Sequence, residues 1–159
     1  MATRAEELAA RFEAANQDVI DCVLGANGNL SATCPAEGWS AAALGAHIGG
    51  GHQGIVDGLV KPIVEGREIP PFEMSAFDEG NKHEAAQNVA MPQDEILTLL
   101  REHGDMAAAY LRSLSDEDLD RATMIPVMGP NPVTAQQMIE MVLIGHPVEH
   151  GQSLRQGLG

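Results

Sequence analysis

The sequence predicts an all-α domain, a four-helix bundle with long crossover connections. Four long segments carry apolar residues at intervals of three and four, and no window alternates strictly between apolar and polar residues. The connections between these segments are about 12 to 25 residues long, whereas simple up-and-down bundles have short loops. At least one connection is therefore expected to cross the bundle.

The first predicted helix covers residues 3 to 25. Thr3 and Glu6 form a capping-box pattern at its start, and Gly25 ends it before a turn-forming run at residues 27–29. Its predicted core face, spaced by threes and fours, consists of Leu8, Phe12, Ala15, Val19 and Val23.

The second predicted helix begins at Trp39 or Ser40, ends near Glu65 and is rich in glycine. Its predicted inward residues are Leu44, His47, Ile48, Ile55, Leu59 and Ile63. Each glycine in a helix interior costs about 1 kcal/mol relative to alanine. Something must offset this cost: close approach of the backbone to a neighbouring helix or a ligand, or a local kink or bulge.

The remaining chain predicts two more long helices. Residues 66–90 form a connection with a short helical piece at about 78–87, and the third helix opens at Met91-Pro92 with proline at its first position. Its inward stripe is Ile96, Leu100, His103, Ala107, Tyr110 and Leu114. After a second connection at 115–133, a capping box of Thr134 and Gln137 starts a last helix that runs to about Gln156. No internal repeat appears, so residues 1–159 are predicted to be a single domain.

Composition narrows the classes of partner. The chain has 9 Lys and Arg against 23 Asp and Glu, a formal net charge of −14 at pH 7, which argues against binding to nucleic acid or anionic membrane surfaces. With no stretch of signal-peptide type and no run of 18 apolar residues, the protein is predicted to be cytoplasmic. Cys22 and Cys34 lack metal-binding spacing and are expected to be inert thiols.

The histidines are the candidate functional residues. His146 and His150 are four residues apart, so they lie on one face of the last helix, together with Ile139 and Leu143. His47 is predicted to point inward from the second helix. Three neutral imidazoles from two facing helices, with one position left for water or substrate, are a reasonable site for zinc or a similar ion. The competing interpretation is that these histidines are hydrogen-bonded core residues.

The motif His146-x-x-Glu149-His150 also fits the inverzincin pattern of zinc peptidases. That interpretation fails because only nine residues follow His150, whereas inverzincins take a further ligand from well downstream. Pro147 is also expected to distort the helix because it removes the hydrogen bond to Leu143. Glu149 is either a base or, as is favoured here, a solvated surface charge.

Two segments and their separation resemble the DinB-like superfamily. They are Trp39-Ser40-Ala41-Ala42-Ala43-Leu44-Gly45-Ala46-His47-Ile48 and Ile144-Gly145-His146-Pro147-Val148-Glu149-His150, with residues 91–120 similar to the family's third helix and following turn. The resemblance covers most of the chain. It implies a DinB-like four-helix bundle in which His47, His146 and His150 bind a divalent metal ion, zinc or nickel.

The same resemblance implies a function. Relatives include mycothiol-dependent maleylpyruvate isomerase and bacillithiol S-transferases, so a metal-dependent thiol transferase or isomerase is expected, with a low-molecular-weight thiol and a small-molecule substrate. The alternatives are a non-catalytic metal-binding or stress-related module, and a structural bundle without metal. A homodimer is expected because relatives often pair and because the glycine-rich helix could admit a partner.

The other histidines are expected to have roles other than the favoured metal ligands. His52 is five residues from His47, roughly 140° around the helix, so the two cannot point the same way. His47 is favoured by the family motif, and His52 is left as a pocket residue or as the replacement ligand. His103 is expected to be hydrogen-bonded in the core, and His83 to be solvated.

Overall fold

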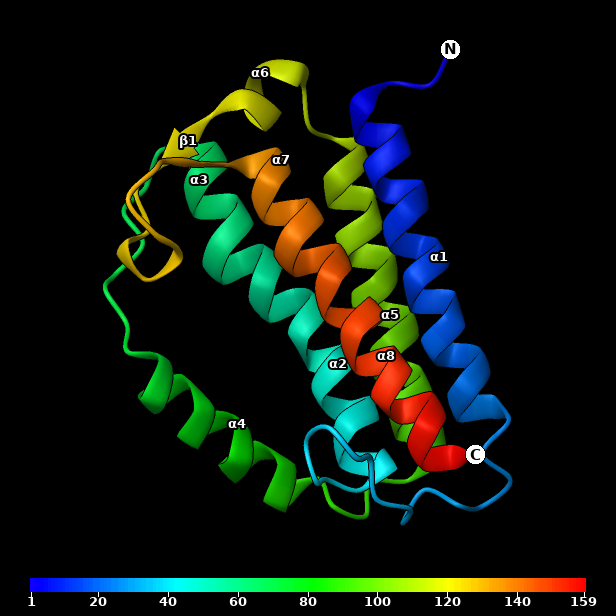
Figure 1. The fold of residues 1–159 in the computed structure, drawn as a ribbon. Coiled ribbons are helices and arrows are strands. Elements are labelled where there is room, and N and C mark those ends of the chain that lie inside the picture. The colour runs from blue at the N-terminus through cyan, green and yellow to red at the C-terminus, as the bar shows by residue number, and fades with distance from the viewer.

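Four long helices pack side by side in the computed structural model, which describes residues 1–159. They are α1 (Arg4–Leu24), the continuous helix of α2 (Ala41–Ile55), η1 (Val56–Val60) and α3 (Lys61–Glu65), α5 (Gln93–Arg112), and the continuous helix of α7 (Ala135–Met138), η3 (Ile139–Ile144) and α8 (Gly145–Leu158). Both α5 and α8 contact α1 and α2, so α1 and α2 lie diagonally across the bundle (Figure 1). The predicted all-α bundle with crossover connections is confirmed.

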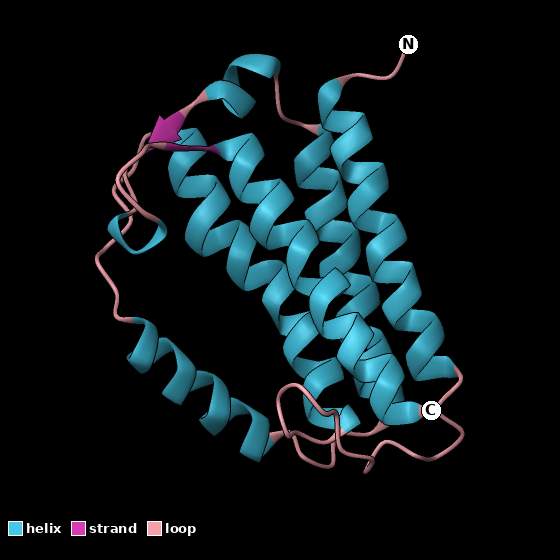
Figure 2. Cartoon of the chain, viewed as in Figure 1, coloured by secondary structure: helices cyan, strands magenta, loops and turns pink.

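Shorter elements fill the connections. They are α4 (Met74–Gln87), α6 (Asp116–Asp120), η2 (Pro126–Met128), β1 (Ala122–Thr123) and β2 (Val133–Thr134). Figure 2 shows α4 standing apart from the bundle. This helix begins four residues before the predicted piece at 78–87, and the expectation of no sheet is wrong to the extent of two antiparallel two-residue strands. Strands this short leave no alternating pattern in the sequence.

Local capping signals set the helix ends. Thr3 with Glu6 and Thr134 with Gln137 both form complete capping boxes, as predicted. Pro92 is the N-cap of α5 and not its first helical residue. None of the helices is at once long enough and apolar enough to cross a membrane.

The core consists of two apolar clusters, one toward each end of the bundle. Phe12, Val56 and Leu143 belong to one cluster, whereas Ile48 and Leu154 belong to the other. Each long helix crosses from one cluster to the other at a level where it carries a polar residue or a glycine: Asn16, His52, Gly104 and His146. The bundle is therefore divided by a polar level, on which His52 and His146 lie.

Two of the long helices contain a π-helical segment shortly before a proline. Pro62 follows η1, and Pro147 follows η3. A proline lacks an N–H group and clashes with the carbonyl four residues earlier, which here belongs to Gly58 and to Leu143. Both of these residues lie in the wider π turns, which accommodate the prolines without ending the helix. The predicted bulge and the predicted distortion at Pro147 are thus both present.

The second long helix presents two neighbouring faces to different surroundings. Its buried face includes His52, Val56 and Val60, whereas Ile55 and Leu59, predicted to be inward, are only half-buried. The sequence pattern does not distinguish these two faces, because apolar residues occupy both. The half-buried face lines a cavity that is described below.

Candidate metal centre

Three histidines meet where α2 faces α8. His47, His146 and His150, together called the histidine cluster, can each offer one nitrogen such that these atoms all lie within 4.8 Å of one another. The Nε2 atoms of His47 and His146 are 3.0 Å apart. Nitrogens bound to a tetrahedral zinc ion lie about 3.3 Å apart, given Zn–N distances near 2.0–2.1 Å. The structure thus brings together the three histidines that the sequence nominated.

Burial keeps two of the three imidazoles uncharged. It lowers the pKa of His47 to about 4 and that of His146 to about 2, and the neighbouring imidazoles shift both values in the same direction. At neutral pH both rings are therefore neutral, which is the form that binds metal. The Nδ1 atom of His146 is also buried without a protein partner. Neutral imidazoles with inward lone pairs fit a borderline-soft divalent ion such as zinc or nickel.

A carboxylate orients His150. Nδ1 of His150 lies 2.7 Å from Oε1 of Glu37, whose second oxygen accepts a hydrogen bond from Ser153. The Glu37 side chain is only 11% exposed. A carboxylate that accepts from one imidazole nitrogen fixes the tautomer and leaves the other nitrogen free to bind metal. Sequence analysis missed Glu37 because it lies in the loop before α2, where helical periodicity gives no signal.

Two further side chains lie beside His47. The ring of Trp39 packs edge-on against it, with ring centroids 5.3 Å apart. Glu84, from α4, places Oε2 3.9 Å from Nδ1 of His47, and burial raises the pKa of this carboxyl group. Although α4 stands apart from the bundle, it thus supplies a carboxyl group to the site.

Two glycines of α2 allow the close approaches that the sequence predicted. A Cβ atom on Gly51 would lie 2.5 Å from Cε1 of His146, and one on Gly49 would lie 2.9 Å from Cβ of Leu99 on α5. Glycine is therefore needed at both positions, once beside the cluster and once beside a neighbouring helix. Both approaches occur within the chain, and the homodimer stays a prediction.

The remaining histidines lie outside the cluster. His52 is fully buried, and its Nε2 lies 2.7 Å from Oδ1 of Asn16, whose amide nitrogen donates to the carbonyl of Leu100. His52 thus donates to Asn16 of α1 and is not part of the cluster. His103 donates from Nδ1 to the carbonyl of Gly49, at 2.9 Å, and His83 is exposed, both as predicted. Glu149 is also exposed, as predicted.

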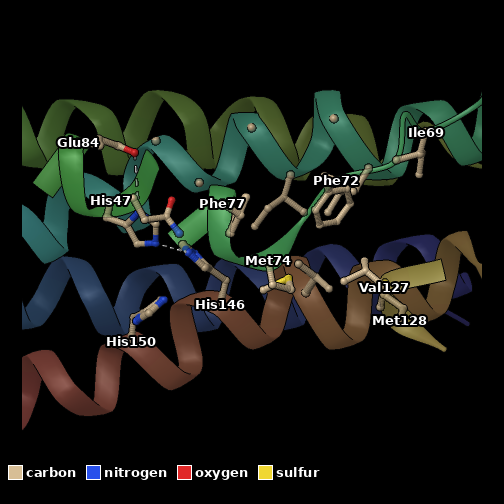
Figure 3. Close-up of a pocket in the computed structure, with 18 of the residues that line it drawn as sticks. His47, Ile69, Phe72, Met74, Phe77, Glu84, Val127, Met128, His146 and His150 are labelled. Carbon is tan, nitrogen blue, oxygen red and sulfur yellow. Dashed lines mark hydrogen bonds and ion pairs between the residues drawn. The ribbon is translucent and has the colours of Figure 1, made fainter. Parts of the chain in front are cut away.

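A cavity of about 680 Å³ reaches the cluster. Its walls come from the α2–η1 helix, the η3–α8 helix, α4, the connection that precedes α4, and η2. Figure 3 shows the three imidazoles at one end, and Ile69, Phe72, Val127 and Met128 toward the other. The site therefore combines a nitrogen-rich end with a long apolar chamber.

The fold and this site define a class: four-helix-bundle proteins with a histidine cluster of the metal-ligating kind at the end of a cavity. The chain belongs to the DinB superfamily, whose family model matches residues 2–154. This confirms the family that the sequence motifs indicated.

One solved structure is similar to this chain over nearly its whole length. It is described as "YfiT from Bacillus subtilis is a probable metal-dependent hydrolase with an unusual four-helix bundle topology". The comparison has a TM-score of 0.69 and 17% sequence identity, and it covers 98% of this chain and 89% of that chain. At this identity the likeness establishes the shared fold. No curated protein sequence matches the chain.

Proposed function

We propose that this protein is a metal-dependent enzyme in which His47, His146 and His150 hold one divalent ion, zinc or nickel. The observation that carries the proposal is that all three clustered imidazoles line the same cavity. Structural zinc sites are closed by four protein ligands, whereas catalytic sites have three and keep one position open. Three ligands that face a chamber large enough for a substrate support an enzyme over a non-catalytic metal-binding module.

The proposed reaction is transfer of a low-molecular-weight thiol to a small substrate, or a thiol-dependent isomerisation. A divalent ion lowers the pKa of a thiol or water bound to it and so supplies a nucleophile at neutral pH. The thiol must come from a separate molecule, because neither Cys22 nor Cys34 lines the cavity. Burial also raises the pKa of Cys34 to about 11, which makes that thiol unreactive.

The chain's own residues have separate roles in this proposal. The histidine cluster holds the ion, and Glu37 keeps His150 in the tautomer that binds it. Glu84 lines the cavity and has a pKa raised by burial, so its carboxylate is placed to accept the proton that the nucleophile loses. The apolar walls orient the substrate and exclude water.

Hydrolysis is the second candidate function. It is favoured by the fold shared with YfiT, described as a probable metal-dependent hydrolase, and it needs the same ion and the same proton acceptor with water as the nucleophile. The two candidates differ in whether a thiol enters the metal site.

Cobalt substitution separates these candidates. Untagged protein loaded with Co²⁺ is titrated with 2-mercaptoethanol, and the visible absorption of the ion is followed. Thiol transfer predicts that the spectrum changes as the thiol binds, and that 1-chloro-2,4-dinitrobenzene is then converted to its thioether. Glu84→Gln should retain the thiol-dependent spectrum and lose turnover. If cobalt binds but no thiol alters its spectrum, thiol transfer is rejected and hydrolysis is tested with ester substrates.

A further inference from the structure

We infer that the cavity binds uncharged, largely apolar molecules and rejects anionic ones. The inference rests on the proposed function in one respect, because it takes the cavity to be the substrate site. It also narrows that function. The substrate of a maleylpyruvate isomerase carries two carboxylates, and a cavity that rejects anions disfavours such a substrate. Binding to the chamber itself does not require the metal ion.

The first observation is that no lysine or arginine lines the cavity. Its ionisable lining groups are the histidine cluster and Glu84, and Glu37 lies directly behind His150. Apart from an ion held by the histidine cluster, the chamber offers an anion no cationic side chain to replace its lost hydration, which is strongly unfavourable. The formal net charge of −14 also repels anions before they arrive.

Three lysine or arginine residues lie close in sequence to residues that line the chamber, and each is already in an ion pair with a carboxylate. Nζ of Lys61 lies 2.6 Å from a carboxylate oxygen of Asp57, and Nε of Arg67 lies 2.6 Å from one of Glu65. Lys82, on α4, is paired with Glu79. These side chains stay on the surface, and none of them lines the chamber.

The second observation is a set of exposed apolar side chains that line the cavity, here called the apolar rim. It consists of Phe72, Met74, Phe77, Val127 and Met128. All five line the cavity, yet Phe77 is 54% exposed and Met74 is 48% exposed. Exposed apolar clusters of this kind mark binding sites on soluble proteins, because leaving them in water is unfavourable.

The rim is formed by segments outside the four long helices. Phe72 precedes α4, Met74 and Phe77 belong to α4, and Val127 and Met128 belong to η2. On α4 only Ala85 is buried, so this helix contributes little to the core. Its two large apolar residues, Met74 and Phe77, instead line the chamber, as Figure 3 shows.

Size completes the description of the ligand. A volume of about 680 Å³ falls within the range of pockets that hold drug-sized molecules. The ligand class is therefore an uncharged apolar molecule of that size, with its reactive polar group at the histidine end. Within the proposed function this favours transfer of a thiol to an apolar electrophile over isomerisation of a small dicarboxylate.

Two fluorescent probes test the charge preference in metal-free protein. N-phenyl-1-naphthylamine and 8-anilino-1-naphthalenesulfonate share the same aromatic skeleton and differ by one sulfonate. Fluorescence titration at neutral pH is expected to show the uncharged probe binding at least about tenfold more tightly. Comparable affinities, or tighter binding of the sulfonate, would overturn the inference. Failure of the uncharged probe to bind would also overturn the inference. This holds equally if sedimentation shows that a second copy of the chain covers the rim.

A matched pair of glycine variants tests the location. Gly54 lines the cavity and Gly80 does not, and a Cβ atom on either would meet nothing within 4 Å. Gly54→Leu should weaken the uncharged probe by about tenfold or more, whereas Gly80→Leu should leave it unchanged. Equal binding by both variants would place the probe elsewhere and reject the inference. Metal titration of the same samples is independent, so failure of the metal site and failure of the apolar chamber give different results.

Discussion

Replacing Gly51 with alanine is expected to weaken metal binding by about 10- to 100-fold while the chain stays folded. The new Cβ atom would lie 2.5 Å from Cε1 of His146, and carbon atoms pack at about 3.5–4.0 Å, so the ring must move by roughly 1 Å. It cannot do so freely, because its centroid is 4.8 Å from that of His47 and 4.6 Å from that of His150. Metal–ligand distances tolerate only about 0.2 Å.

The expected loss corresponds to about 1.4–2.7 kcal/mol of binding free energy. Folding should survive, since alanine gains about 1 kcal/mol of helix propensity over glycine and offsets part of the strain. Metal-free protein is titrated with Zn²⁺ in competition with a chromophoric chelator. Gly54→Ala is the control, because Gly54 is on the same helix and a Cβ atom there meets nothing within 4 Å. If both variants bind zinc as wild type does, the placement of His146 against α2 is wrong.

Three further outcomes are expected. Glu37→Gln keeps a hydrogen-bond acceptor for His150 but loses the charge, and should weaken zinc binding by roughly tenfold in the same titration. His52→Leu leaves Oδ1 of Asn16 without its partner and should lower the free energy of unfolding by about 1–3 kcal/mol, measured by urea denaturation, with metal stoichiometry unchanged. The metal-free protein should lose stability as pH falls below about 6.5, because the unfolded histidines take up protons while His47 and His52, with folded pKa values of about 4 and about 3, do not. At pH 5.5 this amounts to about 1.4 kcal/mol for each such histidine, measured by denaturation across pH.

Each of these expectations has a contrary result. Unchanged zinc affinity in Glu37→Gln would show that the carboxylate does not support His150. Loss of the bound ion in His52→Leu, with the fold intact, would make His52 a ligand. A free energy of unfolding that stays constant between pH 7 and pH 5.5 would show that the buried histidines are not held neutral.

Local patterns in the sequence predicted most of the bundle. Thr3 with Glu6 and Thr134 with Gln137 form short-range caps, and a capping signal needs no knowledge of the rest of the fold. The extent of α4 escaped prediction because Ala85 is its one buried residue, so the helix has no apolar stripe. The two π segments also leave no periodic signal, although Pro147 indicated a distortion near the second of them.

The site was predictable where it depended on helix geometry. His146 and His150 share a face because they are four residues apart, and an inward His47 follows from its place on α2. Glu37 and Glu84 could not be assigned from sequence, because their positions depend on how a loop and an outlying helix fold back onto the bundle. That the three histidines bind an ion stays a prediction.

One titration tests the central claim most directly. Metal-free, untagged protein is titrated with Zn²⁺ by calorimetry at neutral pH, alongside His47→Ala, His146→Ala and His150→Ala, with His83→Ala as the exposed control. The account predicts one ion per chain in wild type and in the control, and a loss of at least about 100-fold in affinity in each cluster variant. Absence of binding to wild type, or binding to a folded His47→Ala variant as tight as to wild type, would contradict it.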